Sequence, residues 1–262
     1  MAAVEYGARG ILGLLVPQAN TPAEPEVGAL LGPDLALLVG RLHSASPELR
    51  ERLEHYLERI DSYIDSFGAA PLAVLGFLIT GATYRLRHAE EDAFFAKLGA
   101  ARGFPIVSAA QSIRRAFAAL GAKRIGLVSP YPAWLTERSL DYWTRAGMNI
   151  VAVETPESPG GFHNIYTMRG PSVLAAARRL ADKKPDVVLL AGAGMPALGP
   201  MMALVDAGVT PLSSNFCMAW QIEQIGSGAP ADAASLRRLL RKDSPWRAVF
   251  AARFPGAVCV PG

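Results

Sequence analysis

The chain has 262 residues, about half of them hydrophobic, and a net charge of only +3. That length is enough for one large domain or for two modest lobes, each with its own core. No apolar run approaches the roughly 20 residues that cross a bilayer, and the first residues lack the layout of a signal peptide, so we expect a cytoplasmic protein without a membrane partner. Two cysteines, Cys217 and Cys259, are too few for a disulfide framework or a metal cluster, and we predict no metal site.

In the first half of the chain, short apolar runs that end at Pro, Gly, Ser or Thr predict buried strands, and apolar residues at helical spacing predict helices. Ser46-Pro47-Glu48 supplies a cap, a proline and an early acid, which together indicate a helix start. We predict, in chain order, a strand over 11–16, a loop over 17–25, a helix from 46–48 through 67, a strand over 72–79, a helix over 90–98, a strand over 105–108 and a helix over 112–120.

The second half shows the same kind of alternation. We predict, in order, a strand over 124–129, a helix through Trp134 and Trp143, a strand over 149–154, an irregular stretch over 155–170, a helix over 173–181, a strand over 187–191, a helix over 196–206, a strand over 210–213, a helix with Cys217 and Trp220, and a tail over 226–262 with one short helix. Alternating strands and helices predict parallel sheets with right-handed crossovers.

The two halves also resemble each other. Residues 9–17 are similar to 124–130, 71–79 to 185–191, and 105–108 to 211–214, in the same order and at a nearly constant offset. We therefore predict an α/β protein of two pseudosymmetric parallel-sheet lobes: residues 1–120, with 215–262 packing back on them, and residues 121–214. Ligands bind beyond the carboxyl ends of strands in such sheets, so two facing sheets would share one cleft.

Basic side chains cluster in one place, at Arg237, Arg238, Arg241 and Lys242, beside three leucines. This pattern is typical of a solvated helix face over an apolar stripe. Because aromatic side chains are not interleaved with the cluster, we expect no nucleic-acid partner.

The segment Gly192-Ala193-Gly194-Met195-Pro196-Ala197 has the glycine spacing of a dinucleotide-binding turn. It follows a late strand rather than the first one, and no acidic residue ends the next strand. We therefore interpret it as a tight strand-to-helix turn whose amides are able to face an anion, and we expect no NAD.

Neutral hydrogen-bond donors follow four of the predicted strands: Asn20, Thr80 with Thr83, Tyr131, and Ser213-Ser214-Asn215. Singly, each of them is typical of a cap or a turn. Together with amides at helix starts, such donors suit carboxylates. The repeat would bring them to one place, so we predict a carboxylate site.

At these residues the chain resembles a known family. Val16-Pro17-x-x-Asn20-Thr21-x-x-Glu24-Pro25-Glu26 is similar to the opening motif of maleate cis-trans isomerases. Ser129-Pro130-Tyr131 and Ser213-Ser214-Asn215-x-x-x-Ala219-Trp220 resemble two further motifs of the group. That group belongs with arylmalonate decarboxylases in the Asp/Glu racemase superfamily, and the resemblance covers residues 9–228.

The resemblance implies a small dicarboxylate between the lobes and no organic cofactor. It also implies that Asn20, Tyr131 and Asn215 hold substrate carboxylates, and that Thr80 and the amides near Gly81, Ala193 and Gly194 contact a carboxylate, as in the decarboxylases. Assembly into a homo-oligomer is compatible with it.

The chain departs from the family at the two cysteines that the isomerases and racemases carry, one per lobe. The first position falls at Ile79 or Thr80, depending on the alignment, and the second at Gly192. Racemisation by two bases and isomerisation by thiol addition both need a thiolate. We therefore expect no two-cysteine mechanism.

Three residues are candidate replacements for the missing acid. Cys217 follows Asn215 in a first helical turn, where the helix dipole lowers a thiol pKa, although a buried packing role is the alternative. His163 lies in a Gly-rich stretch that, by resemblance, covers the cleft, and it either transfers a proton or is an exposed loop residue. Tyr131 either binds a carboxylate or acts as the acid.

Decarboxylation of a malonate-like acid through an enediolate is the leading functional prediction, because cleaving that C–C bond needs no thiol. Related lyase or proton-transfer chemistry belongs to the same class. One alternative is a maleate isomerase or racemase with a relocated acid or base. The other is a carboxylate-binding protein that has lost catalysis.

Overall fold

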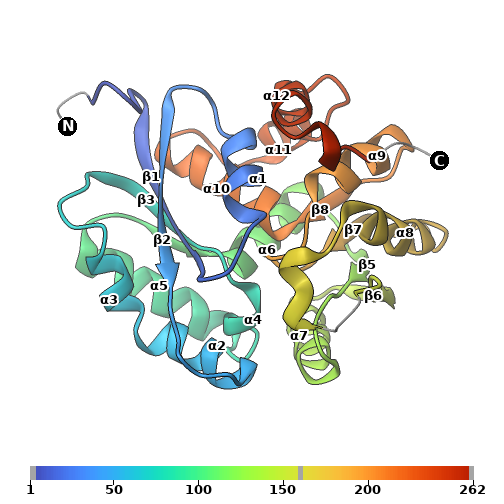
Figure 1. The fold of residues 1–262 in the computed structure, drawn as a ribbon, viewed down its shortest axis with the longest axis horizontal. Helices are drawn as coiled ribbons and strands as arrows, with labels where there is room; N and C mark the ends of the chain where they lie inside the picture. The colour runs from blue at the N-terminus through green and yellow to red at the C-terminus, as the bar shows by residue number, and fades with distance from the viewer. Residues whose placement is uncertain (1–3, 159–161, 260–262) are drawn as a thin grey trace.

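The computed structural model describes residues 4–158 and 162–259 and contains two four-stranded parallel sheets. Their strand orders are β2-β1-β3-β4 and β6-β5-β7-β8. The identical order in both halves confirms the prediction of two pseudosymmetric α/β lobes (Figure 1). Within the described ranges, no helix is both long and apolar enough to cross a membrane.

In the first lobe, β1 (Gly10–Pro17) lies between β2 (Leu35–Leu42) and β3 (Leu72–Phe77), and β4 (Ile106–Ser108) borders β3. Every residue of β1 is buried, as expected for a central parallel strand covered on both faces. Leu15 pairs with Phe77, and Phe77 pairs with Ser108. The carboxyl ends of these strands therefore lie at one edge of the sheet.

The second lobe repeats this arrangement. Its strand β5 (Arg124–Val128) lies between β6 (Asn149–Glu154) and β7 (Val187–Leu190), and β8 (Pro211–Ser213) borders β7. Val128 pairs with Leu190, which in turn pairs with Ser213, so these strands also end at a common edge.

Helices surround both sheets (Figure 1). Their starts follow from local capping: Ser108 accepts a hydrogen bond from the Gln111 amide at the start of α6, and Ser213 does the same for Phe216 at the start of α10. The helices are α1 (Ala23–Leu30), α2 (Leu49–Glu58), α3 (Ile60–Asp65), α4 (Thr80–Thr83), α5 (His88–Arg102), α6 (Ala109–Leu120), α7 (Ala133–Arg145), η1 (Phe162–Thr167), α8 (Gly170–Ala181), α9 (Leu198–Asp206), α10 (Ser214–Gly226), α11 (Ala233–Leu239), α12 (Pro245–Arg253) and η2 (Pro255–Ala257).

The segment after β8 packs against elements of the first half. Helix α10 contacts β1, β3, α1 and α6, while α11 contacts α6 and α12 contacts α1. In Figure 1 these three helices lie on the β1 and α1 side of the molecule and extend over the top of the second sheet.

Four details differ from the sequence-based expectations. Helix α1 and strand β2 were not predicted. Two prolines flank the start of α1, and β2, although it begins with the apolar run 35–39, is an edge strand in which only the two terminal residues are buried. The helix expected from 46–48 through 67 is divided at Arg59, whose backbone leaves helical geometry (φ −104°, ψ 16°). The tail holds two α-helices and a short 3-10 turn rather than one helix.

Candidate active site

A pocket lies between the lobes, at the carboxyl ends of the central strands of both sheets. Gln18 and Ala19 follow β1, and Thr80 and Gly81 follow β3. From the second lobe come Tyr131, after β5, and the turn 192–194, after β7. Helices begin and backbone amides lack sheet partners at the carboxyl ends of parallel strands, and ligands bind there in such sheets.

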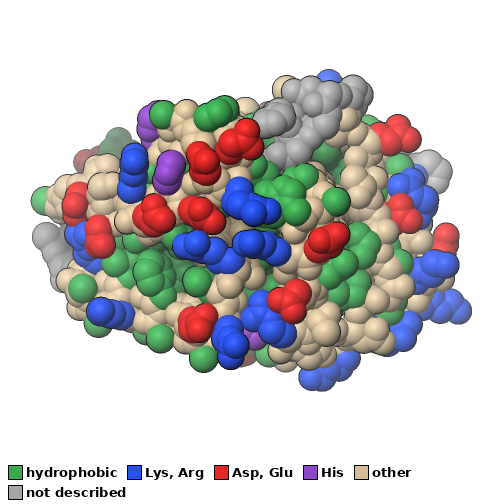
Figure 2. Space-filling model, turned by 90° about the horizontal axis from the view of Figure 1, so that it is seen from below, with side chains coloured by type: hydrophobic (Ala, Val, Ile, Leu, Met, Phe, Trp, Pro, Cys, Tyr) green, Lys and Arg blue, Asp and Glu red, His purple; other side chains and the backbone are tan. Residues whose placement is uncertain are grey.

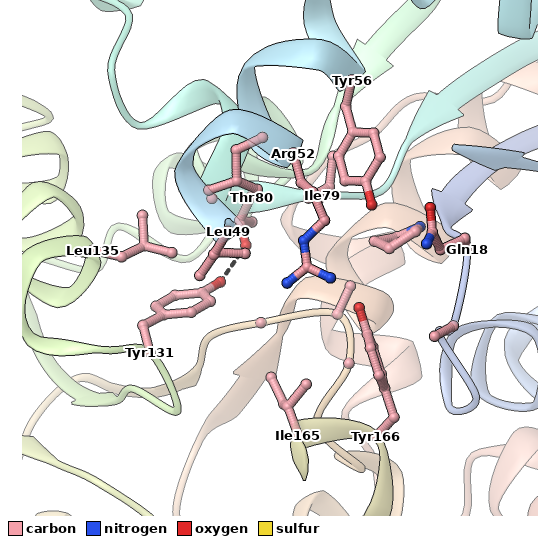
Figure 3. A pocket seen from close by; sticks show the side chains of 17 residues that line it. Gln18, Leu49, Arg52, Tyr56, Ile79, Thr80, Tyr131, Leu135, Ile165 and Tyr166 are labelled. Atoms are coloured by element: carbon pink, nitrogen blue, oxygen red, sulfur yellow. Dashed lines mark hydrogen bonds between the residues drawn. The ribbon is translucent and has the colours of Figure 1, made fainter. Parts of the chain in front are cut away.

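Two further segments complete the walls (Figure 3). Helix α2 contributes Leu49, Arg52, Leu53 and Tyr56 on one of its faces, and η1 contributes Ile165 and Tyr166 from the second lobe. Arg52 is the only charged side chain among the described residues that line the pocket.

Thr80 and Tyr131 join the two lobes across the pocket. The Thr80 Oγ1 and Tyr131 hydroxyl oxygens are 2.6 Å apart and share a hydrogen bond in which either can donate (Figure 3). Burial raises the pKa of Tyr131 to about 12, so the phenol is protonated at neutral pH. A protonated phenol beside a hydroxyl is a pair of neutral donors suited to an oxyanion.

Five of the predicted carboxylate-binding residues line this pocket: Thr80, Gly81, Tyr131, Ala193 and Gly194. The amides of Ala193 and Gly194 donate to no acceptor within the described ranges of the chain, whereas the Gly192 amide donates to Ser214 Oγ at 3.1 Å. The turn therefore offers two backbone donors beside the pocket.

The two predicted asparagines have a different geometry. Asn20 Nδ2 donates to the Ala193 carbonyl at 3.0 Å, and Asn215 Nδ2 donates to the same carbonyl at 3.3 Å. Both side chains are buried, and neither lines the pocket. They hold the 192–194 turn from behind, and Asn215 Nδ2 uses both of its N–H groups within the protein, on the Ala193 carbonyl and on Glu26.

Glu26 is a functional candidate that the sequence did not single out. Its fully buried carboxylate accepts from the amides of Ala197 and Leu198 at the start of α9 and from Asn215 Nδ2 at 2.7 Å. It thus connects α1 of the first lobe to the turn and helix that follow β7. Its place in the 16–26 motif was visible, but its partners are about 170 to 190 residues away in sequence.

Burial raises the pKa of Glu26 to about 7, although its three donors oppose the rise. Because the folded pKa is above the ordinary value of 4.5, the contribution of Glu26 to stability is fully present below pH 4.5 and is lost as the pH rises through 7. The pKa difference corresponds to about 3 kcal/mol at about 1.36 kcal/mol per pKa unit.

We therefore expect the unfolding free energy of the wild type to fall by about 3 kcal/mol between pH 4.5 and 8, measured relative to that of the Glu26→Gln variant. Glutamine is the reference because it resembles the protonated carboxyl group. Urea unfolding of both proteins across this pH range measures the difference. A difference that stays constant with pH would contradict an elevated pKa for Glu26.

The positions expected to match the family cysteines are Ile79 or Thr80 in the first lobe and Gly192 in the second, and all of them line the pocket. Gly192 has a φ of +101°, and a Cβ placed on it would lie 3.0 Å from Pro130 Cγ and 3.3 Å from the Tyr131 hydroxyl. A side chain at this position is therefore strained by the backbone and crowded by Tyr131.

The predicted replacement acids are placed unequally. Cys217 is fully buried inside α10, outside the pocket, and burial raises the pKa of its thiol despite its first-turn position. The helix turns this side chain into the core, so the structure does not support its predicted role as an acid. The side chain of His163 is not among those that the structure describes. Of the other two candidates, only Tyr131 lines the pocket.

Arg52, Tyr56 and Tyr166 are pocket residues that sequence reasoning missed. A weak signal existed for α2, because positions 49, 52, 53 and 56 share one helical face and Arg52 interrupts an otherwise apolar set. Nothing local indicates that this face covers a pocket rather than a sheet.

Comparison with known proteins agrees with the fold. The model of the arylmalonate decarboxylase family matches residues 12–240. Maleate isomerase from Nocardia farcinica is 27% identical over 249 residues, covering 89% of this chain and 96% of the relative.

Two solved structures are also similar. A Nocardia farcinica maleate cis-trans isomerase mutant with a covalently bound succinylcysteine intermediate has a TM-score of 0.74 at 23% identity, over 87% of this chain and 98% of that one. Arylmalonate decarboxylase has a TM-score of 0.70 at 19% identity, over 84% and 94%.

The chain belongs to the arylmalonate decarboxylase family. The resemblance drawn from the three sequence motifs is confirmed, as is the two-lobed architecture. The named relatives are maleate isomerases and an arylmalonate decarboxylase.

Proposed function

We propose that this protein decarboxylates a small malonate-like acid through an enediolate, without a thiol. The observation that carries the proposal is the composition of the pocket. Neutral donors, Thr80 and Tyr131 with the amides of Ala193 and Gly194, lie beside the apolar side chains of Leu49, Leu53, Ile79 and Leu135, and no described lining residue is a cysteine.

The chemistry follows from this pairing. The carboxylate to be lost occupies the apolar side, where poor solvation favours departure as uncharged CO₂. The bond between this carboxylate and the α-carbon breaks, and its electron pair passes into the retained carboxylate to give an enediolate. Thr80, Tyr131 and the two amides hold the enediolate oxygens, because neutral donors stabilise charge as it develops.

Protonation of the α-carbon completes the reaction. Phenols are the candidate donors among the described lining residues, because Tyr56, Tyr131 and Tyr166 all face the pocket. Burial raises the pKa of Tyr56 and of Tyr131 to about 12, and it raises the pKa of Tyr166 as well. All three are protonated at neutral pH, and an enediolate carbon is basic enough to take a proton from a phenol or from water. His163 remains a predicted donor, and its side chain is not among those that the structure describes.

Isomerisation is the second candidate, because the named relatives include maleate isomerases. One relative carries a covalently bound succinylcysteine intermediate. In this chain we expect Ile79 or Thr80, and Gly192, at the positions of the family cysteines, and none of these residues supplies a thiolate that can add to an alkene. Decarboxylation therefore fits the lining residues better.

A panel of substituted malonates in D₂O, followed by proton NMR, tests the proposal. We expect loss of CO₂ and one deuterium on the α-carbon of the product. Interconversion of maleate and fumarate without any decarboxylation would favour the isomerase, and saturable binding without turnover of any compound would favour a carboxylate-binding protein.

Thiol alkylation separates the two mechanisms further. We expect iodoacetamide to leave the activity of the native protein unchanged, because Cys217 is fully buried and Cys259 lies outside the pocket. Activity assayed after alkylation, with mass spectrometry to count modified thiols, makes the measurement. Activity that falls in step with modification of Cys217 would show that a thiol takes part.

A further inference from the structure

Four hydrogen-bond donors that face the pocket have no partner in the part of the chain that the structure describes. They are the Arg52 guanidinium, Gln18 Nε2, and the hydroxyls of Tyr56 and Tyr166, and none of them has a hydrogen bond or ion pair within the described ranges. They come from α2, the end of β1 and η1, so both lobes contribute. Figure 3 shows the Arg52 guanidinium between Tyr131 and Tyr166, with Gln18 and Tyr56 on the same side as Tyr166.

Arg52 is the decisive member of this set. Its Nε is buried and has no acceptor, and a guanidinium keeps its charge at any ordinary pH. The side chain as a whole is half-buried in the pocket wall, and no acidic side chain among the described lining residues balances its charge. A cation that is partly removed from water without a counter-charge is destabilised. The arrangement is therefore complete only when a ligand brings an anionic group to it.

The charge at Arg52 also indicates which part of the substrate lies there. A carboxylate paired with a guanidinium is stabilised in the ground state, which opposes its loss as CO₂. The departing carboxylate thus belongs on the apolar side, near Leu49 and Leu135, and the enediolate belongs at Thr80 and Tyr131. Arg52 is therefore left to contact the substituent on the α-carbon of the substrate.

Resting on the proposed decarboxylation, we propose that Arg52 is the specificity-determining residue and that the substrate is a malonate whose substituent ends in a third carboxylate. A planar carboxylate can take two parallel hydrogen bonds from a guanidinium, and Gln18, Tyr56 and Tyr166 supply neutral donors around it. The substrate class is therefore a short-chain tricarboxylate.

The test compares a malonate carrying a carboxymethyl group with the same malonate carrying a carbamoylmethyl group, which has nearly the same shape but no third charge. For the wild type we expect kcat/KM to be about 10- to 100-fold higher for the tricarboxylate, the range for a hydrogen-bonded charge. Arg52→Leu should abolish this preference, and Arg52→Lys should keep part of it.

Arg50→Gln is the matched control, because Arg50 also belongs to α2 but lies over the Trp134 ring of α7, 5.0 Å from its centroid, and does not line the pocket. We expect its preference to equal that of the wild type. Calorimetry with both compounds, under conditions too brief for turnover, measures binding separately from the reaction.

The outcomes distinguish this inference from the proposed function. Equal turnover of both compounds by the wild type would overturn the role of Arg52 and leave decarboxylation standing. Tighter binding of the tricarboxylate that Arg52→Leu removes, with no CO₂ released, would support the role of Arg52 and overturn decarboxylation. The absence of both preference and turnover would overturn both.

Discussion

Tyr131→Phe is expected to lower the decarboxylation rate by about 10²–10³-fold, the usual effect of removing one donor from an oxyanion site. The hydroxyl lies 2.6 Å from Thr80 Oγ1, and the two groups approach the pocket from opposite lobes. Phenylalanine keeps the ring and the packing against Tyr84, whose centroid is 6.1 Å away, and removes only the donor. The fall should therefore be in kcat more than in KM.

Steady-state kinetics with the best malonate substrate measures this effect. Tyr6→Phe serves as the control. It removes the same hydroxyl group from a side chain that is 81% exposed and does not line the pocket. A Tyr131→Phe variant with nearly full kcat would remove the phenol from the enediolate site.

Glu26→Ala is expected to reduce the unfolding free energy at pH 6 by about 3–5 kcal/mol. The substitution leaves the amides of Ala197 and Leu198 and the Asn215 amide group buried without their acceptor, and each unsatisfied buried donor costs about 1–3 kcal/mol. Water that enters the space left by the side chain would accept some of these hydrogen bonds, so the total loss of stability is smaller than the sum of the three separate costs.

Urea unfolding gives the measurement, and Glu24→Ala is a matched control on the same helix. Glu24 pairs with Arg41 at 2.7 Å, but both side chains are 41% exposed, and such pairs contribute less than about 1 kcal/mol. If both variants lose similar stability, Glu26 does not connect the lobes in the way the structure indicates.

The sequence predicted the parts of this fold that depend on burial along the chain. Strands β1, β3, β5 and β7 are short apolar runs, and the order in which they repeat indicates two facing sheets. Edge strand β2 escaped prediction because only its terminal residues are buried. The proline-rich start of α1 resembled a loop for a similar reason, since propensity there is overridden by packing against α10 and α12.

Side-chain direction limited the prediction of the site. Thr80 and Tyr131 were identified because they follow strands, and strand ends meet at one edge. Asn20 and Asn215 also follow strands, yet their amides turn back to one carbonyl, at Ala193. Cys217 is two residues beyond Asn215, and the helical rotation between them places its thiol in the core.

Arg52 illustrates a different limit. Its place in the pocket was not predicted, because it depends on α2 lying beside strand ends of both lobes. Those segments are far from α2 in the sequence. Amphipathic spacing indicates that positions 49, 53 and 56 of α2 are covered, but it does not distinguish a covering sheet from a covering pocket.

The central claim, carboxylate cleavage without a thiol, is tested most directly by the variant that replaces both cysteines, Cys217→Ala with Cys259→Ala. The measurement is release of ¹³CO₂ from carboxyl-labelled malonates in D₂O, together with deuterium on the α-carbon of the product. The account predicts that this thiol-free protein, once shown to be folded, releases labelled CO₂ at nearly the wild-type rate. A folded thiol-free variant that releases none, beside an active wild type, would contradict it.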